Sequence, residues 1–165
     1  MDPWVLEHIG AKASWCRRDV VESVLHLARE IAREGREGRR IGTLFTIGRT
    51  AAVLASSRAL ILDPLAGHAP AATAIGDPNL RGTVKELAQL DGAFVISEEG
   101  AVVAACRYLD SPADGLDVPL GLGSRHLAAA AVSRQCGAIA ITVSASGGIR
   151  VFCDGEAIVE LTSVS

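Results

Sequence analysis

Apolar side chains recur at three- and four-residue spacing in the segment that follows Asp19. The set comprises Val20, Val21, Val24, Leu25, Ala28, Ile31 and Ala32, with charged side chains between them. This pattern predicts an amphipathic helix that packs on the body of the domain, in preference to one that binds a separate partner, and Gly35 is placed to end it. The loop at residues 35–40 (Gly-Arg-Glu-Gly-Arg-Arg) has a short, interrupted basic run. We interpret it as a solvated loop, with a phosphate or nucleic-acid patch as the alternative.

Short apolar runs bounded by glycine, proline and acidic residues predict strands in the rest of the chain. The expected order is a buried strand at 41–47, a helix at 49–56, an irregular crossing at 63–78, a helix at 83–90, a strand from 94 that pairs with 101–105, a loop at 110–123, a helix at 125–135 capped by Ser124, a hairpin of 138–143 with 149–153, and a last strand at 156–161. The sum is an α/β fold in which a central mixed β-sheet is flanked by helices on both faces.

The length of the chain fits one domain. At 165 residues it can bury roughly 70% of its unfolded surface, so it needs no disulfide or metal to hold it together. We therefore expect a single domain at residues 1–165, with an N-terminal helix and loop at 1–40 and the core at 41–161.

Charge and composition narrow the classes of function. A formal net charge of -3 argues against nucleic acid as a partner, and aromatic residues, at 4%, provide few platforms for stacking bases. The apolar runs are too short to cross a membrane, and the N-terminus has no secretory signal pattern, so we expect a cytoplasmic protein without a membrane partner. The four cysteines lack zinc or redox spacing and are expected to be buried free thiols.

Small and polar residues interrupt the apolar pattern at three places. They are Asp91-Gly92-Ala93, residues 121–126 (Gly-Leu-Gly-Ser-Arg-His) and residues 144–148 (Ser-Ala-Ser-Gly-Gly). Each lies at the end of a predicted strand or helix, where side chains and free backbone N–H groups meet without disturbing the core.

The segment 121–126 has the features of an anion site. Its glycines allow close approach of the backbone, the helix that begins near Ser124 points its positive end at the segment, and Arg125 adds a charge. A phosphate-binding loop is the hypothesis, and a plain capping loop is the alternative, because the motif is neither a Walker loop nor a dinucleotide fingerprint. His126 is compatible with a core residue, a metal ligand or a phosphate donor.

Asp91 places a carboxylate beside two small residues. One carboxylate together with substrate phosphates is a common way to hold Mg²⁺, whereas a turn or capping aspartate is the alternative. The sequence offers no activated nucleophile near these motifs. A carboxylate and a phosphate cradle without a nucleophile point to nucleotide chemistry that depends on metal and positioning.

Two of these motifs, in this order and with a hairpin between them, resemble the diadenylate cyclase (DAC, DisA-N-type) domain. The family's hallmarks are an Asp-Gly-Ala motif, found here at Asp91-Gly92-Ala93, and an Arg-His motif, found here within residues 123–129 (Gly-Ser-Arg-His-Leu-Ala-Ala). Further likeness lies at residues 41–45, 62–64, 83–90, 107–109 and 151–155. The Gly-Leu-Gly-x-Arg-His form and the Ser-Gly-Gly-x-Arg-Val-Phe ending are most similar to the archaeal-type branch.

The resemblance implies a nucleotidyltransferase that joins two ATP molecules into the second messenger cyclic di-AMP and releases two pyrophosphates, with Mg²⁺ or Mn²⁺ as the cofactor. It also implies a homodimer or higher homo-oligomer, because each domain presents one ATP to a facing domain. By the same likeness, the catalytic residues are Asp91, Arg125 and His126, with Asp91 also the metal ligand. The nucleotide-binding residues are Gly92, Ala93, Leu109, Gly123, Ser124 and Ser144.

Two positions depart from the family pattern. Many members have Arg-His-Arg where this chain has Arg125-His126-Leu127, and the family usually carries an acidic residue where this chain has Ala145. Because that acid is associated with the metal and nucleotide site, its loss motivates a second hypothesis, a catalytically weakened module that binds ATP or cyclic di-AMP. A third hypothesis is a nucleotide-binding fold that prefers GTP or another nucleotide and runs another reaction.

Overall fold

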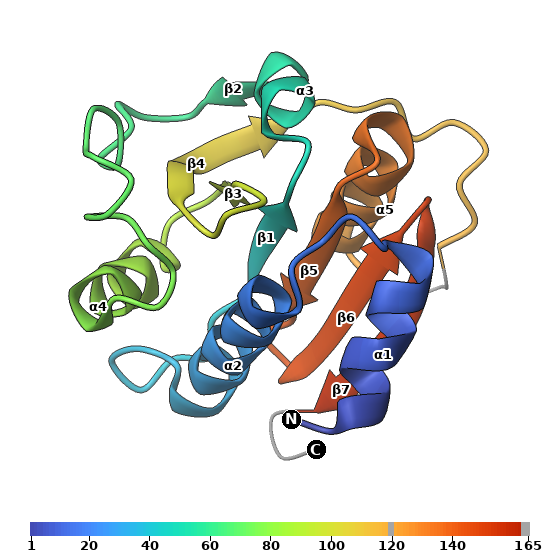
Figure 1. The fold of residues 1–165 in the computed structure, drawn as a ribbon, viewed down its shortest axis with the longest axis horizontal. Coiled ribbons are helices and arrows are strands. Elements are labelled where there is room, and N and C mark those ends of the chain that lie inside the picture. The colour runs from blue at the N-terminus through green and yellow to red at the C-terminus, as the bar shows by residue number, and fades with distance from the viewer. Residues whose placement is uncertain (119–120, 163–165) are drawn as a thin grey trace.

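The computed structural model describes residues 1–118 and 121–162, in which one mixed sheet carries the strand order β2-β4-β3-β1-β5-β6-β7 (Figure 1). The strands are β1 (Thr43–Ile47), β2 (Ser57–Ala59), β3 (Ala93–Ile96), β4 (Val102–Leu109), β5 (Ile139–Val143), β6 (Gly148–Cys153) and β7 (Glu156–Thr162). The helices are α1 (Pro3–Lys12), α2 (Arg18–Glu34), α3 (Thr50–Ala55), α4 (Pro78–Leu87) and α5 (Ser124–Cys136). β1 and β3 are parallel, and the other neighbouring strands are antiparallel.

Helices cover both faces of this sheet, with α1 and α2 in front and α5 behind (Figure 1). Successive strand residues point to opposite faces, so Phe45 packs in the cluster that includes α2, and Leu44 packs in the cluster that includes α5. Every residue of β1, β3 and β5 is buried. The predicted α/β fold with a mixed sheet and helices on both faces is therefore confirmed.

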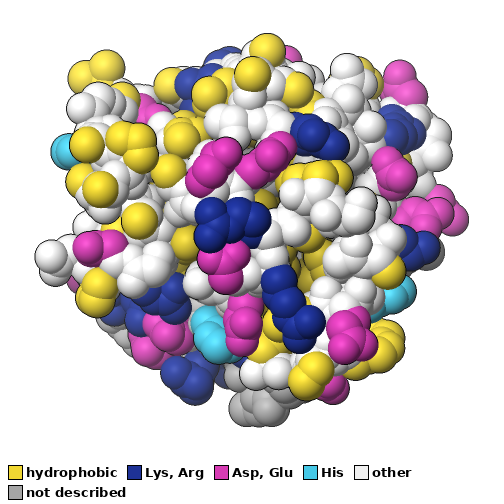
Figure 2. Space-filling model, in the orientation of Figure 1, with side chains coloured by type: hydrophobic (Ala, Val, Ile, Leu, Met, Phe, Trp, Pro, Cys, Tyr) yellow, Lys and Arg dark blue, Asp and Glu magenta, His cyan; other side chains and the backbone are white. Residues whose placement is uncertain are grey.

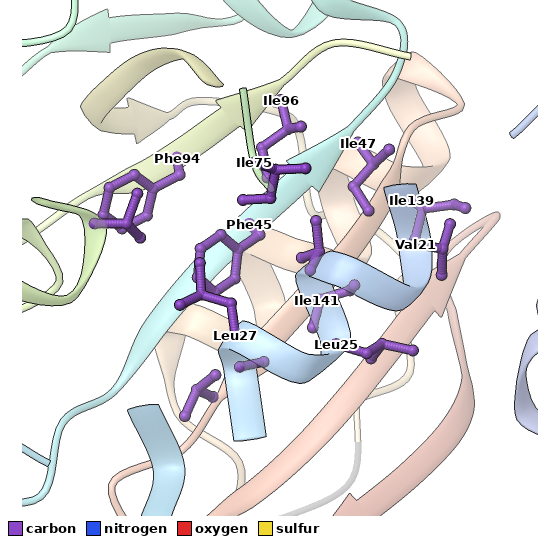
Figure 3. Close-up of a cluster of buried hydrophobic side chains, with 14 of the residues drawn as sticks. Val21, Leu25, Leu27, Phe45, Ile47, Ile75, Phe94, Ile96, Ile139 and Ile141 are labelled. Atoms are coloured by element: carbon purple, nitrogen blue, oxygen red, sulfur yellow. The ribbon is translucent and has the colours of Figure 1, made fainter. Parts of the chain in front are cut away.

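The larger cluster lies between α2 and the sheet (Figure 3). Phe45 of β1 stacks on Phe94 of β3 with ring centroids 5.2 Å apart, and Leu25 and Leu27 of α2 are fully buried in the same cluster. Burial of each such side chain stabilises the fold by about 1.5–3 kcal/mol. This cluster anchors the strands whose ends carry the candidate motifs.

An ion-pair network joins α4 to α2. The Lys85 ammonium lies 2.7 Å from Glu30 and 3.1 Å from Glu34, and Arg81 lies 3.2 Å from Glu30. Burial by itself raises the pKa of Glu30, but the hydrogen bond from Lys85 and the charge of Arg81 outweigh it and hold the pKa below its usual value. The network fixes the helix whose end leads into Asp91.

Several boundaries correct the sequence-based expectations. α4 begins at Pro78 instead of 83, because the Asp77 carboxylate caps it by accepting from the backbone N–H groups of Asn79 and Leu80. The N-cap of α5 is Gly123, so the prediction that Ser124 caps this helix is wrong. Two elements, α1 and β2, were not predicted, although Asp2-Pro3 at the start of α1 is a common helix-start signal.

The surface of the described residues carries both charged and exposed apolar side chains. Acidic and basic side chains are interspersed on the face shown in Figure 2, and apolar side chains gather there over the segment between β2 and α4. Within that segment, Leu62 is 96% exposed.

None of the helices described is long and apolar enough to cross a membrane. All four cysteines are free thiols, as predicted, but the prediction that they are buried is correct only for Cys106; the other three are partly exposed.

Candidate active site

Strand direction brings the motifs together at one edge of the sheet. β1 and β3 both begin at this edge, because they are parallel with Leu44 opposite Ala93. The antiparallel β5 ends there, because Val143 pairs with Thr43. Asp91, which precedes β3, and Ser144, which follows β5, therefore reach the same edge, where they and the N-terminus of α5 line one cavity.

This edge contains a cavity of about 710 Å³. The structure places every candidate residue in its wall: Asp91, Gly92, Ala93, Leu109, Gly123, Ser124, Arg125, His126 and Ser144. Ala145 lies in the wall as well. Three segments that are far apart in the sequence thus share one concave space of the size that small-molecule ligands occupy.

Gly92 is required by the backbone that crosses behind it. Its φ of +104° is rarely adopted by residues with a side chain, and a Cβ there would lie 2.6–2.7 Å from backbone atoms of Cys106 and Arg107. The close approach is created by a bulge in β4, where the register shifts between the Ala93 and Val95 pairs and Cys106 has a φ of +56°. Asp63 supports the bulge by accepting from the Ala105 N–H at 3.3 Å.

Gly42 makes room for Arg125. A Cβ on Gly42 would lie 2.5 Å from Arg125 Nη1 and 3.1 Å from the Val143 carbonyl oxygen. The guanidinium therefore crosses the start of β1 against bare backbone and reaches the cavity wall. Its position depends on a glycine that lies more than eighty residues away in the sequence.

The N-terminus of α5 opens on the cavity. Its N-cap, Gly123, provides no side-chain oxygen to cap the first turn, and both Gly123 and Ser124 are exposed in the wall. Unbonded N–H groups and the positive end of the helix dipole favour an anion here.

His126 lies at the inner end of the same turn and is only 6% exposed. Burial, followed by the charges of Arg150 and Arg125, lowers its pKa below the usual value. Arg150 Nη1 lies 3.5 Å from Nε2, and a guanidinium can only donate, so the ring proton belongs on Nδ1. Nδ1 is buried without a partner among the described residues. The ring is thus a neutral donor with an unmet hydrogen bond.

Ser144 belongs to a tight turn at the end of β5. Its hydroxyl lies 2.8 Å from the Ser146 hydroxyl and accepts from the Ser146 N–H at 3.2 Å. The Gly147 N–H donates to the Ser144 carbonyl at 2.8 Å. Ala145 occupies the exposed corner of this turn, so its methyl group faces the cavity and solvent.

Residues 30–157 match the model of the DAC family, described as DisA bacterial checkpoint controller nucleotide-binding. The chain belongs to the DAC family. A curated diadenylate cyclase of Methanocaldococcus jannaschii is 50% identical over 145 residues, and one of Haloferax volcanii is 40% identical over 144 residues. The DAC chain described here spans 46% and 52% of the lengths of these two relatives.

Solved structures support the fold of the DAC domain. A double cysteine variant of DacA from Staphylococcus aureus superimposes with a TM-score of 0.55 at 24% identity, covering 88% of this chain and 89% of that one. A hypothetical membrane spanning protein from Bacillus cereus gives a TM-score of 0.58 at 19% identity, covering 84% of this chain and 60% of that one.

Six residues of the cavity wall were given no role by the sequence patterns: Leu44, Arg58, Leu60, Arg107, Tyr108 and Ala128. Arg58 and Tyr108 pair across β2 and β4, and the guanidinium lies 4.7 Å from the centre of the ring. Arg58 reaches the cavity because β2 pairs with β4 as the outermost strand of the DAC sheet. A three-residue strand carries too little periodicity to be recognised in a sequence, so no signal was available for Arg58, whereas Tyr108 lies in the 107–109 segment of the family likeness.

Arg107 also lines the DAC cavity, but its side chain is engaged elsewhere. It donates to the hydroxyl and the carbonyl of Ser57 at 3.1 and 3.0 Å, and to the Leu54 carbonyl at 3.2 Å. Its guanidinium therefore ties β4 to the end of α3.

The state of His126 predicts how the stability of the DAC domain depends on pH. Because the folded pKa lies below the unfolded one, the unfolded chain binds the proton first as pH falls through about 6.5. The stability that the fold gains by holding His126 neutral is fully present above that pH, and it is lost as the pH falls toward the folded pKa of His126. We expect urea unfolding of His126→Gln to show a smaller loss of stability between pH 7.5 and 5.5 than the parent.

The exposed His26 provides the control. His26→Gln removes an imidazole outside the cavity and controls for the loss of one histidine from the chain. If the stability of His126→Gln depended on pH as steeply as that of the parent, the lowered pKa of His126 would be contradicted.

Proposed function

We propose that this domain is a diadenylate cyclase that condenses two ATP molecules into cyclic di-AMP and releases two pyrophosphates. The observation that carries the proposal is the meeting of Asp91, the N-terminus of α5 and the Ser144 turn around one cavity of about 710 Å³. A carboxylate and a phosphate cradle that share a nucleotide-sized space, with no nucleophilic side chain assigned there, suit phosphoryl transfer between bound nucleotides. The names of the two archaeal relatives agree with this reaction.

The reaction places clear demands on the site. The 3′-oxygen of one nucleotide attacks the α-phosphorus of the other, a new O–P bond forms, and the bond to the β-phosphate oxygen breaks. Pyrophosphate leaves with that electron pair, and the proton of the 3′-hydroxyl must be accepted. Two such transfers close the ring. Catalysis then consists of positioning, acceptance of the proton and stabilisation of charge on the phosphates.

The residues of the cavity can meet these demands. Asp91 is the candidate to orient and deprotonate the 3′-hydroxyl, with Gly92 and Ala93 lining the ribose and Leu109 packing on adenine. Ser124, Arg125 and the open N–H groups of Gly123 and the first turn of α5 are suited to hold the triphosphate. His126 lines the same wall and is a further candidate to contact the triphosphate, and the Ser144 hydroxyl adds another contact.

The donors present fit a metal ion that arrives with the nucleotide. Among residues 1–118 and 121–162, no group of three or more His, Cys, Asp or Glu side chains is close enough to hold an ion unaided. Asp91 provides one carboxylate, which suffices for Mg²⁺ or Mn²⁺ when substrate phosphates complete the coordination. A bound ion of this kind supplies charge neutralisation at the phosphates.

Two copies are needed because one cavity holds one nucleotide. The 3′-oxygen of that nucleotide must meet the α-phosphorus of another, so two cavities have to face each other in a homodimer or higher homo-oligomer. Around the cavity, Leu60, Tyr108 and Leu127 are exposed apolar side chains that a second copy would cover. Gel filtration with and without a non-hydrolysable ATP analogue tests this, with a larger species expected in its presence.

Mass spectrometry of the products tests the reaction itself. The chain is incubated with ATP and either Mn²⁺ or Mg²⁺, with Asp91→Asn as the inactive control. Cyclic di-AMP from the parent and none from the control supports the cyclase. If no product forms while calorimetry still detects ATP binding, the cyclase proposal is wrong and the binding module remains.

Ala145 favours that second candidate, a weakened module that binds ATP or cyclic di-AMP. Its side chain is exposed at a turn in the cavity wall, so a longer acidic side chain fits without steric cost. For a cyclase weakened at this position, we expect Ala145→Glu to raise cyclic di-AMP formation about tenfold, because a further carboxylate would support metal binding.

The matched control is Ala11→Glu, which adds the same charge at an exposed position of α1 outside the cavity. It should leave the rate unchanged. Unchanged turnover in Ala145→Glu, together with intact ATP binding and little parental product, would favour the binding module.

A further inference from the structure

A second cavity, of about 280 Å³, adjoins the nucleotide cavity and shares the wall residues Asp91 and Arg125 with it. The rest of its wall comes mainly from the loop after α2 and the end of α4. That loop contributes Arg36, Arg39 and Arg40. Four arginines against one aspartate make the wall strongly positive, although the whole chain has a net charge of -3.

The loop that carries these arginines is held in one conformation. Arg36 and Arg39 exchange backbone hydrogen bonds of 2.9 and 2.8 Å, and the two residues between them, Glu37 and Gly38, have φ values of +52° and +75°. This is the geometry of a tight hairpin turn. Gly35 packs so closely on the Arg39 carbonyl that a Cβ would overlap it. The Arg36 side chain, 3.0 Å from Glu86, ties the turn to α4.

The guanidinium groups of Arg39, Arg40 and Arg125 have no hydrogen bond or ion pair in the part of the chain that the structure describes. Some of the other arginines are paired with carboxylates, as Arg81 is with Glu30 and Arg150 with Glu160. Unpaired guanidinium groups around a small concave space are suited to an anion with several oxygens, since each can bind two of them side by side. Exposed guanidinium groups without partners also occur in a solvated loop, but here Arg39 and Arg40 line a concave space together with Arg125.

On the basis of the proposed cyclase function, we propose that this cavity, which we call the arginine pocket, binds a pyrophosphoryl group. The proposed reaction releases such a group in the nucleotide cavity, and Asp91 and Arg125 line both that cavity and the arginine pocket. The group could be the terminal part of a bound nucleotide or the pyrophosphate that leaves. Both sources present the same oxygen-rich, highly charged chemistry to Arg39 and Arg40.

Calorimetric titration with sodium pyrophosphate tests the proposal, because it needs no turnover. The variant is Arg39→Gln with Arg40→Gln, which removes two exposed side chains that have no described polar contacts. We expect its dissociation constant for pyrophosphate to rise about tenfold or more, because two charge-assisted contacts are lost. The matched control is Arg18→Gln with Arg33→Gln, which removes the same charge from the two ends of α2 and should bind pyrophosphate like the parent.

A parallel titration with α,β-methylene ATP separates the two sources. Weaker binding of both ligands by the Arg39/Arg40 variant supports the proposal with the nucleotide's own phosphates as the ligand, and weaker binding of pyrophosphate alone supports it with the leaving group. Unchanged pyrophosphate binding in the variant overturns the proposal, even if cyclic di-AMP forms. If no cyclic di-AMP forms while the arginines still control pyrophosphate binding, the arginine pocket stands and the cyclase function fails.

Discussion

Gly92→Ala is expected to lower the free energy of unfolding by about 2–6 kcal/mol, combining a disfavoured backbone conformation and overpacking at about 1–3 kcal/mol each. The φ of +104° disfavours any residue with a side chain, and the new Cβ would lie 2.6–2.7 Å from backbone atoms of Cys106 and Arg107. Backbone in a central sheet cannot move aside as a flexible side chain can. In a thermal melt this corresponds to a decrease of roughly 5–20 °C.

Gly82→Ala is the matched control for this substitution. Gly82 lies inside α4, and beyond its chain neighbours and the helix's own backbone no heavy atom of the described residues lies within 4 Å of a Cβ added there. Alanine is favoured over glycine in a helix interior, so this control should gain up to about 1 kcal/mol. Similar melting temperatures for Gly92→Ala and the parent would show that the β4 bulge does not constrain Gly92.

The second large effect is expected at Asp91. Asp91→Asn should reduce the rate of cyclic di-AMP formation by about 10²–10⁴-fold, because the amide can neither accept the 3′-hydroxyl proton nor attract a divalent cation as a carboxylate does. The side chain is exposed and almost unchanged in shape, so the melting temperature should remain that of the parent. The rate is measured by quantifying cyclic di-AMP over time.

Asp114→Asn controls for the loss of one negative charge, since Asp114 is exposed and lies outside both cavities. It should turn over ATP like the parent. If Asp91→Asn turned over ATP like the parent, Asp91 would have no part in the proposed mechanism. If instead turnover fell because ATP bound more weakly, Asp91 would serve in binding and not in proton transfer.

Much of the local structure was evident in the sequence. The apolar stripe that begins at Val20 predicted α2 and its end at Gly35, where the backbone adopts a φ of +60°. The apolar runs around Phe45 and Phe94 predicted buried strands, because a sheet covered on both faces favours apolar residues on both sides of each strand. Short elements were less visible, and β2 was missed because three residues carry no usable period.

The order of Asp91-Gly92-Ala93 and Arg125-His126 along the chain indicated the family, and the apolar periodicity indicated the mixed α/β fold, because local spacing is recorded in the sequence. Only the tertiary structure decided which groups meet. Because β1 and β5 are antiparallel, Asp91 and Ser144 line one cavity. Gly42 lies against the Arg125 side chain, and the β4 bulge at Cys106 lies against Gly92. The tertiary structure also turned the 35–40 loop toward Asp91 as the arginine pocket. Strand direction, bulge position and close backbone approach depend on contacts between distant segments, and no local pattern encodes them.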